Sequence, residues 1–431
     1  MNARFSWLMH TLCAACVLAF APSSFAANRT VCLQIQVRDE RNGCPTPGTT
    51  GVKRACDPTG NYSNFVGSTF ELWDKDATVG DDDFIGVWVQ SINGVGCVTF
   101  DWEASRADDG DTTEANPDVY LRLKYEVWGL DPSGPPLRVR DGAGTEITTV
   151  VTWRDQGANF NITDCATGGT CSFGDIHIPS HSTTSDMAIR FVMLDSAQRG
   201  LELYDPELGT DPIYAWYPTV NNPNGVSCGT GLAWTQNDFC LPNGLGDDGD
   251  RTTHEFGHVA QMRMFEQNSL NDVIVGGGWS MATNSFETES AATTEGFAAY
   301  VGAVAWYDPQ NNSSPSVTPF YGGANIEDVT LAQSTCASNI TLPLQAAKAF
   351  WDLDDLVNEA GTRAGADNDT SSQQTLWMLQ RWDNFVDGTS NRQDRESDNN
   401  GVNVRDYLNQ ATATHSETLL EHNCLVSQDD N

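Results

Sequence analysis

The chain has 431 residues, of which 58 are acidic and 23 are lysine or arginine, so its net charge at pH 7 is −35. A surface this acidic repels nucleic acid and anionic membranes, so we expect no nucleic-acid partner. The length allows two or three domains, each with an adequate hydrophobic core.

The first 26 residues have the composition of a secretory signal peptide. Arg4 lies in a short n-region, residues 12–21 are apolar, and Ser24-Phe25-Ala26 provides a small-x-small cleavage site. No later stretch is long and apolar enough to span a bilayer. We therefore predict a secreted protein without a membrane span, with the periplasm or the cell surface as alternative destinations.

Ten of the 12 cysteines remain once the signal peptide is removed. An even number of cysteines in an exported chain predicts disulfides, and no C-x-x-C pair remains to suggest a cysteine-ligated metal. The sequence does not determine the connectivity, but it is compatible with three pairs: Cys165–Cys171, Cys228–Cys240 and Cys336–Cys424.

Between residues 28 and 160 the sequence has no long helical period. It has short runs that alternate as β-strands do or are rich in β-branched and aromatic residues, and clusters of Gly, Pro, Asn and Asp separate them. This pattern predicts a β-sandwich over residues 27–180. The predicted strands are 31–37, 70–73, 85–89, 97–102, 119–127 and 147–153.

An acidic segment, FELWDKDATVGDDDFIG at residues 70–86, resembles a loop of transthyretin-like and C2-like sandwiches. In C2 domains such aspartates bind calcium through hard oxygen ligands. The resemblance implies a candidate calcium site made of Asp74, Asp76 and Asp83, with Asp82 as the alternative to Asp83. A solvated acidic turn without any ion is the competing interpretation.

Beyond a boundary placed near residue 180, the pattern changes. Apolar residues recur at helical spacing over residues 184–204, which predicts an amphipathic helix. Residues 213–217 are then predicted to form a strand.

The string His254-Glu255-Phe256-Gly257-His258 matches the pattern H-E-x-x-H. On a helix, residues four apart lie on one face, so both imidazoles can bind a single ion. Nitrogen ligands at this spacing suit catalytic Zn²⁺, which typically takes three protein ligands and a water. Glu255 can then reach that water as a general base.

A third ligand must come from elsewhere in the chain. Gln261 and Met264 occupy the positions where a metzincin has Gly and His, so that class is excluded. The alternative is a glutamate on a following helix, and the candidates are Glu287, Glu289 and Glu295. We favour Glu295 because its helical neighbours are small, which allows two helices to approach closely; these neighbours are Ala291, Ala292, Ala298, Ala299 and Gly302.

These motifs resemble those of gluzincin-type zinc metallopeptidases. The resemblance rests on THEFGH at 253–258, TTEGFAAY at 293–300 and AFWDLDD at 349–355, and it covers residues 181–431. It implies a zincin-like fold that hydrolyses proteins or peptides, with zinc held by His254, His258 and Glu295. In such folds an edge strand pairs with the extended substrate, and either 213–217 or 232–239 is expected to be that strand.

The C-terminal third is predicted to be helical over 342–359, 373–386 and 403–413. The sequence therefore predicts an α+β protein, with a β-sandwich at 27–180 and a mainly helical zincin-like domain at 181–431. We expect a secreted zinc endopeptidase that depends on Zn²⁺, with Ca²⁺ as a further candidate ion. The alternative is a non-catalytic secreted adhesion or binding protein whose zinc site is structural or vestigial. The oligomeric state is not predicted.

Overall fold

The computed structural model of the chain describes sixteen segments, on which all structural statements below rest. These are residues 28–38, 62–74, 83–89, 95–101, 119–129, 134–141, 151–152, 170–178, 186–204, 208–229, 231–246, 248–264, 289–308, 316–317, 324–325 and 343–354. The predicted signal peptide and the predicted helices 373–386 and 403–413 lie outside them.

The first sheet is built around the long strand β1 (Asn28–Arg38). β1 runs antiparallel to β2 (Tyr62–Asn64) and β5 (Val95–Asp101), and parallel to β9 (Thr170–Ile178). A disulfide between Cys32 and Cys97, which are register partners on β1 and β5, fixes the pairing of these strands.

The second sheet contains eight strands in the order β11-β12-β10-β7-β6-β3-β4, with β8 paired to β6. It is mixed, because β10 runs parallel to both β7 and β12 while the other pairs are antiparallel. The strands are β3 (Ser68–Asp74), β4 (Asp83–Val89), β6 (Val119–Val127), β7 (Leu137–Arg140), β8 (Val151–Thr152), β10 (Ile213–Trp216), β11 (Leu232–Thr235) and β12 (Asp238–Cys240).

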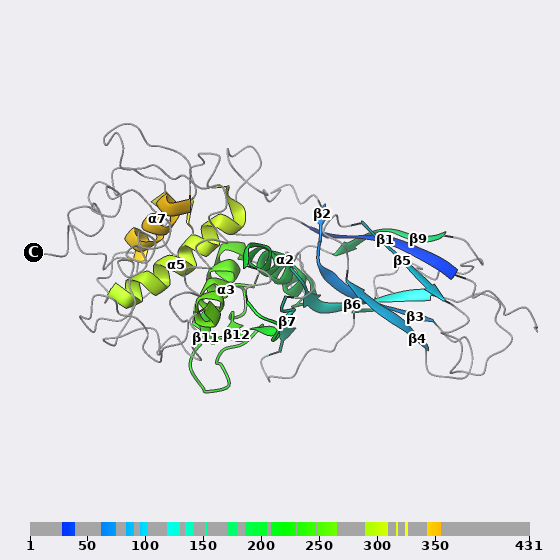
Figure 1. The fold of residues 1–431 in the computed structure, drawn as a ribbon. Coiled ribbons are helices and arrows are strands. Elements are labelled where there is room, and N and C mark those ends of the chain that lie inside the picture. The colour runs from blue at the N-terminus through cyan, green and yellow to red at the C-terminus, as the bar shows by residue number, and fades with distance from the viewer. Residues whose placement is uncertain are drawn as a thin grey trace, which may run out of the picture.

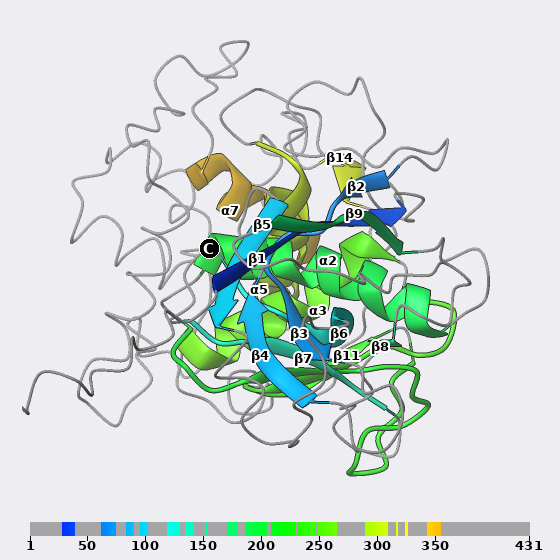
Figure 2. The same cartoon turned by 90° about the vertical axis from the view of Figure 1, so that its right-hand side faces the viewer.

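The described segments contain four helices. They are α2 (Asp186–Tyr204), α3 (Gly249–Met264), α5 (Glu289–Trp306) and α7 (Pro343–Asp354). Figure 1 shows strands β1, β3 to β6 and β9 at one end of the molecule, α5 and α7 at the other, and α2 between them. A small two-stranded sheet, β13 (Ser316–Val317) with β14 (Ala324–Asn325), completes the described elements and is visible in Figure 2.

Helix α2 packs its apolar residues onto the larger sheet. Burial alternates along β7, where Leu137 and Val139 are buried, as expected for a strand with one face toward a core. Phe191 of α2 lies 5.1 Å from Tyr125 of β6 and 5.8 Å from Phe65, between ring centroids. The predicted helix 184–204 is thereby confirmed, and it joins the sheets to the helical end.

The structure confirms the α+β class and most of the strands predicted from the sequence. It also confirms the disulfide Cys228–Cys240, which links the segment before β11 to the end of β12. The other two suggested pairs involve residues outside the described segments. The larger sheet joins β7 and β10, which lie on opposite sides of residue 180; the division into domains stays a prediction. Within the described segments, no helix has the length and apolar character needed to cross a membrane.

Candidate metal centre

Helix α3 carries the H-E-x-x-H motif and begins with a well-formed cap. The Asp248 carboxylate accepts a hydrogen bond from the backbone amide of Arg251 at 3.1 Å, and the Asp248 carbonyl accepts one from the amide of Thr252 at 3.0 Å. Such capping satisfies amides that the first turn of a helix leaves without partners. The start of α3, and with it the position of the motif, is fixed by this aspartate.

Small residues bring α3 and α5 into close contact. A Cβ atom added to Gly257 would lie 2.9 Å from the Cα of Ala298 and 3.0 Å from the Cβ of Val301, so the backbones touch there without room for a methyl group. One turn away, a Cβ on Gly302 would lie 2.9 Å from Oδ1 of Asp250. The stripe of small residues predicted around Glu295 is the surface that allows this approach.

The close contact places one carboxylate against two imidazoles. His254 Nε2 lies 3.4 Å from Glu295 Oε2, and His258 Nε2 lies 3.6 Å from Glu295 Oε1. One ligand atom from each residue lies within 4.8 Å of the others. Tetrahedral zinc with bonds of about 2.1 Å separates its ligand atoms by about 3.4 Å. The three side chains, called the triad below, therefore fit a metal ion.

Burial and mutual charge perturb all three members of the triad, which are at most 2% exposed. Burial lowers the pKa of His254 to about 4, against an opposing hydrogen bond to Glu295. Burial alone would also lower the pKa of His258, but the charge of Glu295 outweighs it and raises that pKa. The pKa of Glu295 lies well below its usual range because the two histidines outweigh the effect of burial. The carboxylate is therefore ionised and available as a ligand.

The Glu255 side chain packs against the segment before β11. A Cβ on Gly231 would come within 2.8 Å of the Glu255 Cδ atom, so only glycine leaves room for the carboxylate. A backbone hydrogen bond from Ala233 of β11 also reaches the carboxylate and lowers its pKa in part. Burial raises the pKa of Glu255 to about 7, with the nearby His258 lowering it in part. A carboxylate with a pKa near neutrality is suited to accept and release a proton.

The segment that contacts Glu255 is held in place by several bonds. The amide of Gly231 donates to the carbonyl of Cys228 at 2.6 Å, and the amide of Cys228 donates to the carbonyl of Val220 at 2.9 Å. The Cys228–Cys240 disulfide ties the segment to β12. Arg263, in the last turn of α3, donates to the carbonyl of Gln236 at 2.7 Å between β11 and β12. The hairpin is therefore fixed relative to α3.

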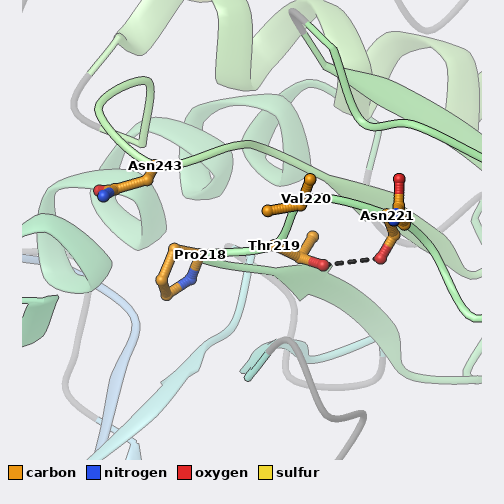
Figure 3. Close-up of a pocket in the computed structure, with 5 residues that line it drawn as sticks. All are labelled: Pro218, Thr219, Val220, Asn221 and Asn243. Carbon is orange, nitrogen blue, oxygen red and sulfur yellow. Dashed lines mark hydrogen bonds between the residues drawn. The ribbon is translucent and has the colours of Figure 1, made fainter.

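A cavity of about 560 Å³ lies next to this segment, between the chain after β10 and the turn after β12 (Figure 3). Its lining residues are Pro218, Thr219, Val220, Asn221 and Asn243, and the Thr219 hydroxyl donates to the carbonyl of Asn221 at 2.7 Å. No member of the triad lines the cavity. Val220, which lines the cavity, accepts the hydrogen bond from the amide of Cys228 in the segment that leads to Gly231.

Only some of the other predicted site residues lie within the described segments. Asp74 and Asp83 are register partners at the ends of β3 and β4, while Asp76 and Asp82 lie outside the described segments, so the calcium site stays a prediction. Glu287 also lies outside them. Within them, the triad is the one group of at least three His, Cys, Asp or Glu residues that could share an ion.

Two residues near the triad had no assigned role in the sequence. Nothing in the pattern around Gly231 signals that it would abut Glu255, because the contact joins parts of the chain 24 positions apart. For Gln261 a signal does exist. It follows His254 by seven positions and His258 by three, which is the spacing of one helix face.

Comparisons with known proteins identify no family. No protein-family model matches the chain, and no curated protein matches it. Among solved structures, one match is a 9R-lipoxygenase from Cyanothece PCC8801, at 17% identity and a TM-score of 0.19. That match covers 41% of this chain and 23% of the lipoxygenase chain, and at this TM-score it carries no argument about fold or function.

Proposed function

We propose that the protein is a secreted, zinc-dependent endopeptidase of the gluzincin type. The observation that carries the proposal is the triad itself: two imidazole nitrogens and a carboxylate at tetrahedral separations, beside the buried Glu255 carboxylate. A structural metal site would not need a carboxylate of this kind next to its ligands.

Zinc is the ion that this donor set favours. Two histidines and one glutamate are the ligands of a well-known class of catalytic zinc site, in which a fourth position stays open to water or substrate. When bound, zinc would act as a Lewis acid and supply a nucleophilic water near neutral pH. Calcium, which prefers six to eight oxygen ligands, does not suit the triad and would be confined to the acidic residues Asp74, Asp76 and Asp83.

Glu255 would perform the proton transfers. Its pKa of about 7 allows it to take a proton during attack on the peptide carbonyl and to return that proton to the departing amine. His254 and His258 would hold the reacting centre in place through their Nε2 atoms. Glu295, ionised and buried, would balance positive charge there.

Substrate would bind as an extended peptide along an edge strand. β11 is the end strand of the larger sheet, and Gly231, which contacts Glu255, immediately precedes it. A peptide paired with the free edge of β11 would pass close to the proposed base. We therefore favour β11 over β10, because β10 is already paired on both sides.

The finer architecture belongs to the same proposal. Residues 27–180 would form a β-sandwich, and residues 181–431 would form the zincin-like domain. Disulfides Cys32–Cys97 and Cys228–Cys240 are compatible with an oxidising extracellular environment, and they support secretion after removal of the first 26 residues.

The complete burial of the site favours a second candidate function. Glu255 is 0% exposed and the triad is nearly so, which is also the expectation for a structural metal site in a non-catalytic binding protein. In that case zinc would stabilise the protein without any hydrolysis.

Activity on casein separates the two. For the endopeptidase we expect hydrolysis that a chelator abolishes and added Zn²⁺ restores. Glu255→Gln should keep its zinc but lose orders of magnitude in rate. Glu71→Gln, on β3 in the sheet region, is the matched control and should keep full activity. Zinc binding without hydrolysis by the parent protein would exclude the enzyme in favour of the second candidate.

A further inference from the structure

One polar side chain close to the triad has no role so far. Gln261 is 1% exposed, and neither its amide nitrogen nor its amide oxygen has a hydrogen-bond partner within the described part of the chain. Burying an amide without partners costs free energy, so nearly all buried amides in native proteins are paired. The Gln261 amide is therefore a buried donor and acceptor that no described hydrogen bond uses.

The helix geometry places Gln261 beside the triad. An α-helix turns by about 100° per residue, so Gln261 lies about 20° around the axis from His254 and about 60° from His258. It lies about 40° from Gly257, which faces α5. Gln261 therefore points between the metal face of α3 and the face that contacts α5.

The register between the helices shows what lies opposite. Gly302 contacts Asp250, and Ala298 contacts Gly257, so residue numbers fall along α5 as they rise along α3. Glu295 meets both histidines in the same progression. The next turn of α5 brings Thr294 opposite Gln261, and the buried Thr294 hydroxyl also has no partner within the described segments. Gln261 thus lies one turn beyond the Glu295 carboxylate.

Glu295 faces both histidines. Its two carboxylate oxygens lie 3.4 Å from His254 Nε2 and 3.6 Å from His258 Nε2. If Glu295 ligates a metal ion through one oxygen, the other oxygen stays in a buried site and needs a hydrogen-bond donor there. Ligating carboxylates normally receive a hydrogen bond from a neighbouring group.

We propose that the carboxamide of Gln261 positions the Glu295 carboxylate in the metal-bound protein, donating from Nε2 to the oxygen that the metal leaves free. The inference rests on the metal-binding part of the proposed function. It makes Gln261 a positioning residue whose hydrogen bond exists only in the metal-bound state. Removing the amide should therefore leave the stability of the metal-free protein unchanged or raise it, while it lowers the affinity for zinc.

The test uses Gln261→Met, which keeps the unbranched chain and removes the amide. The metal-free variant should unfold at the same temperature as the parent or higher, because it no longer buries an unpaired amide. Its affinity for Zn²⁺, measured by competition with a chromogenic chelator, should fall by roughly 10- to 100-fold. The visible absorption of the Co²⁺ form should shift, since the carboxylate is no longer held in one orientation.

Gln198→Met is the matched control. Gln198 is also buried and lies on α2, where its Nε2 donates to Glu202 at 2.7 Å. This variant should keep the parent's zinc affinity. Gln261→Leu serves as a second variant if the methionine variant does not fold, and loss of folding in both would overturn the proposal, because an amide without partners cannot be needed by the metal-free fold.

Three further results are informative. If Gln261→Met binds zinc as tightly as the parent, the proposal is wrong. If its zinc affinity is unchanged and only KM for a peptide rises, Gln261 contacts substrate instead, which also overturns it. If the parent itself binds no zinc, the proposed function fails first, so the two failures are distinguishable.

Discussion

Gly257 offers the strongest test of how the triad is assembled. Gly257→Ala adds a methyl group where the Cα of Ala298 is 2.9 Å away and the Cβ of Val301 is 3.0 Å away. Carbon atoms pack at about 3.5–4.0 Å, so α3 and α5 must separate by about 0.5–1 Å. This displacement moves His254 and His258 away from Glu295.

The expected loss of zinc affinity depends on whether the added methyl group is strained in the metal-free or in the metal-bound protein. The metal-free variant can relax by separating the helices, and alanine favours a helix over glycine by about 1 kcal/mol, so its stability should change little. Metal binding requires ligand distances within about 0.2 Å of ideal, which forces the helices back together. Overpacking of this kind costs about 1–3 kcal/mol. We therefore expect zinc affinity to fall about 5- to 150-fold.

The assay is chelator competition for zinc, paired with urea unfolding of the metal-free protein. Gly200→Ala is the control, because its new methyl group would meet the Phe256 ring, with Cε1 at 2.6 Å, and would disturb the α2 side of α3 instead of the α5 side. It should change stability but leave zinc affinity near the parent value. An unchanged zinc affinity in Gly257→Ala would refute the view that close helix approach sets the ligand geometry.

The remaining predictions concern the triad, the base and the hairpin. Glu295→Ala should be stripped of zinc while Glu289→Ala keeps it, as measured by metal content; the reverse would move the ligand to Glu289. Burial raises the pKa of Glu255 from 4.5 to about 7, so the folded state binds its proton more tightly than the unfolded state, and this stabilisation is lost as pH rises from about 4.5 to about 7. In urea unfolding of the metal-free proteins, the free energy of unfolding of Glu255→Gln minus that of the parent should therefore rise by on the order of 3 kcal/mol from pH 4.5 to pH 8. If this difference does not change with pH, burial does not raise the pKa of Glu255. Arg263→Met should lose about 2–4 kcal/mol of unfolding free energy, because its guanidinium donates to the carbonyls of Gln236, Leu208 and Asp211; a loss below about 1 kcal/mol would show that these bonds are replaced by water.

The triad could be anticipated from the sequence because its determinants are local. The spacing of His254 and His258 fixes their common helix face, and the small residues around Glu295 identify the helix that can approach it. Both features depend on helical periodicity, which a single sequence displays directly. The sequence also places Gln261 near the face of the two histidines, since its spacing from them is helical. Only the structure shows that its amide is buried and without a hydrogen bond in the described segments, which is what suggests a role for it.

Long-range pairings could not be anticipated. The Cys32–Cys97 disulfide depends on β1 and β5 being register neighbours, and ten cysteines allow many pairings. The contact of Gly231 with Glu255 depends on how a hairpin packs on a helix. Turn and strand patterns predict that such elements exist, but not which elements become neighbours, because sheet order is decided by tertiary packing.

The parallel pairing of β7 with β10 has a consequence for how this chain can be cut. The two strands are far apart in sequence, yet β10 receives its hydrogen bonds from β7 on one side and β12 on the other. A protease that removed the chain up to residue 180 would take β3, β4, β6 and β7 with it, leaving β10 as a bare edge with unpaired amides and carbonyls. Exposed edges of this kind recruit strands from other molecules. A fragment starting at residue 181 would therefore be prone to aggregate.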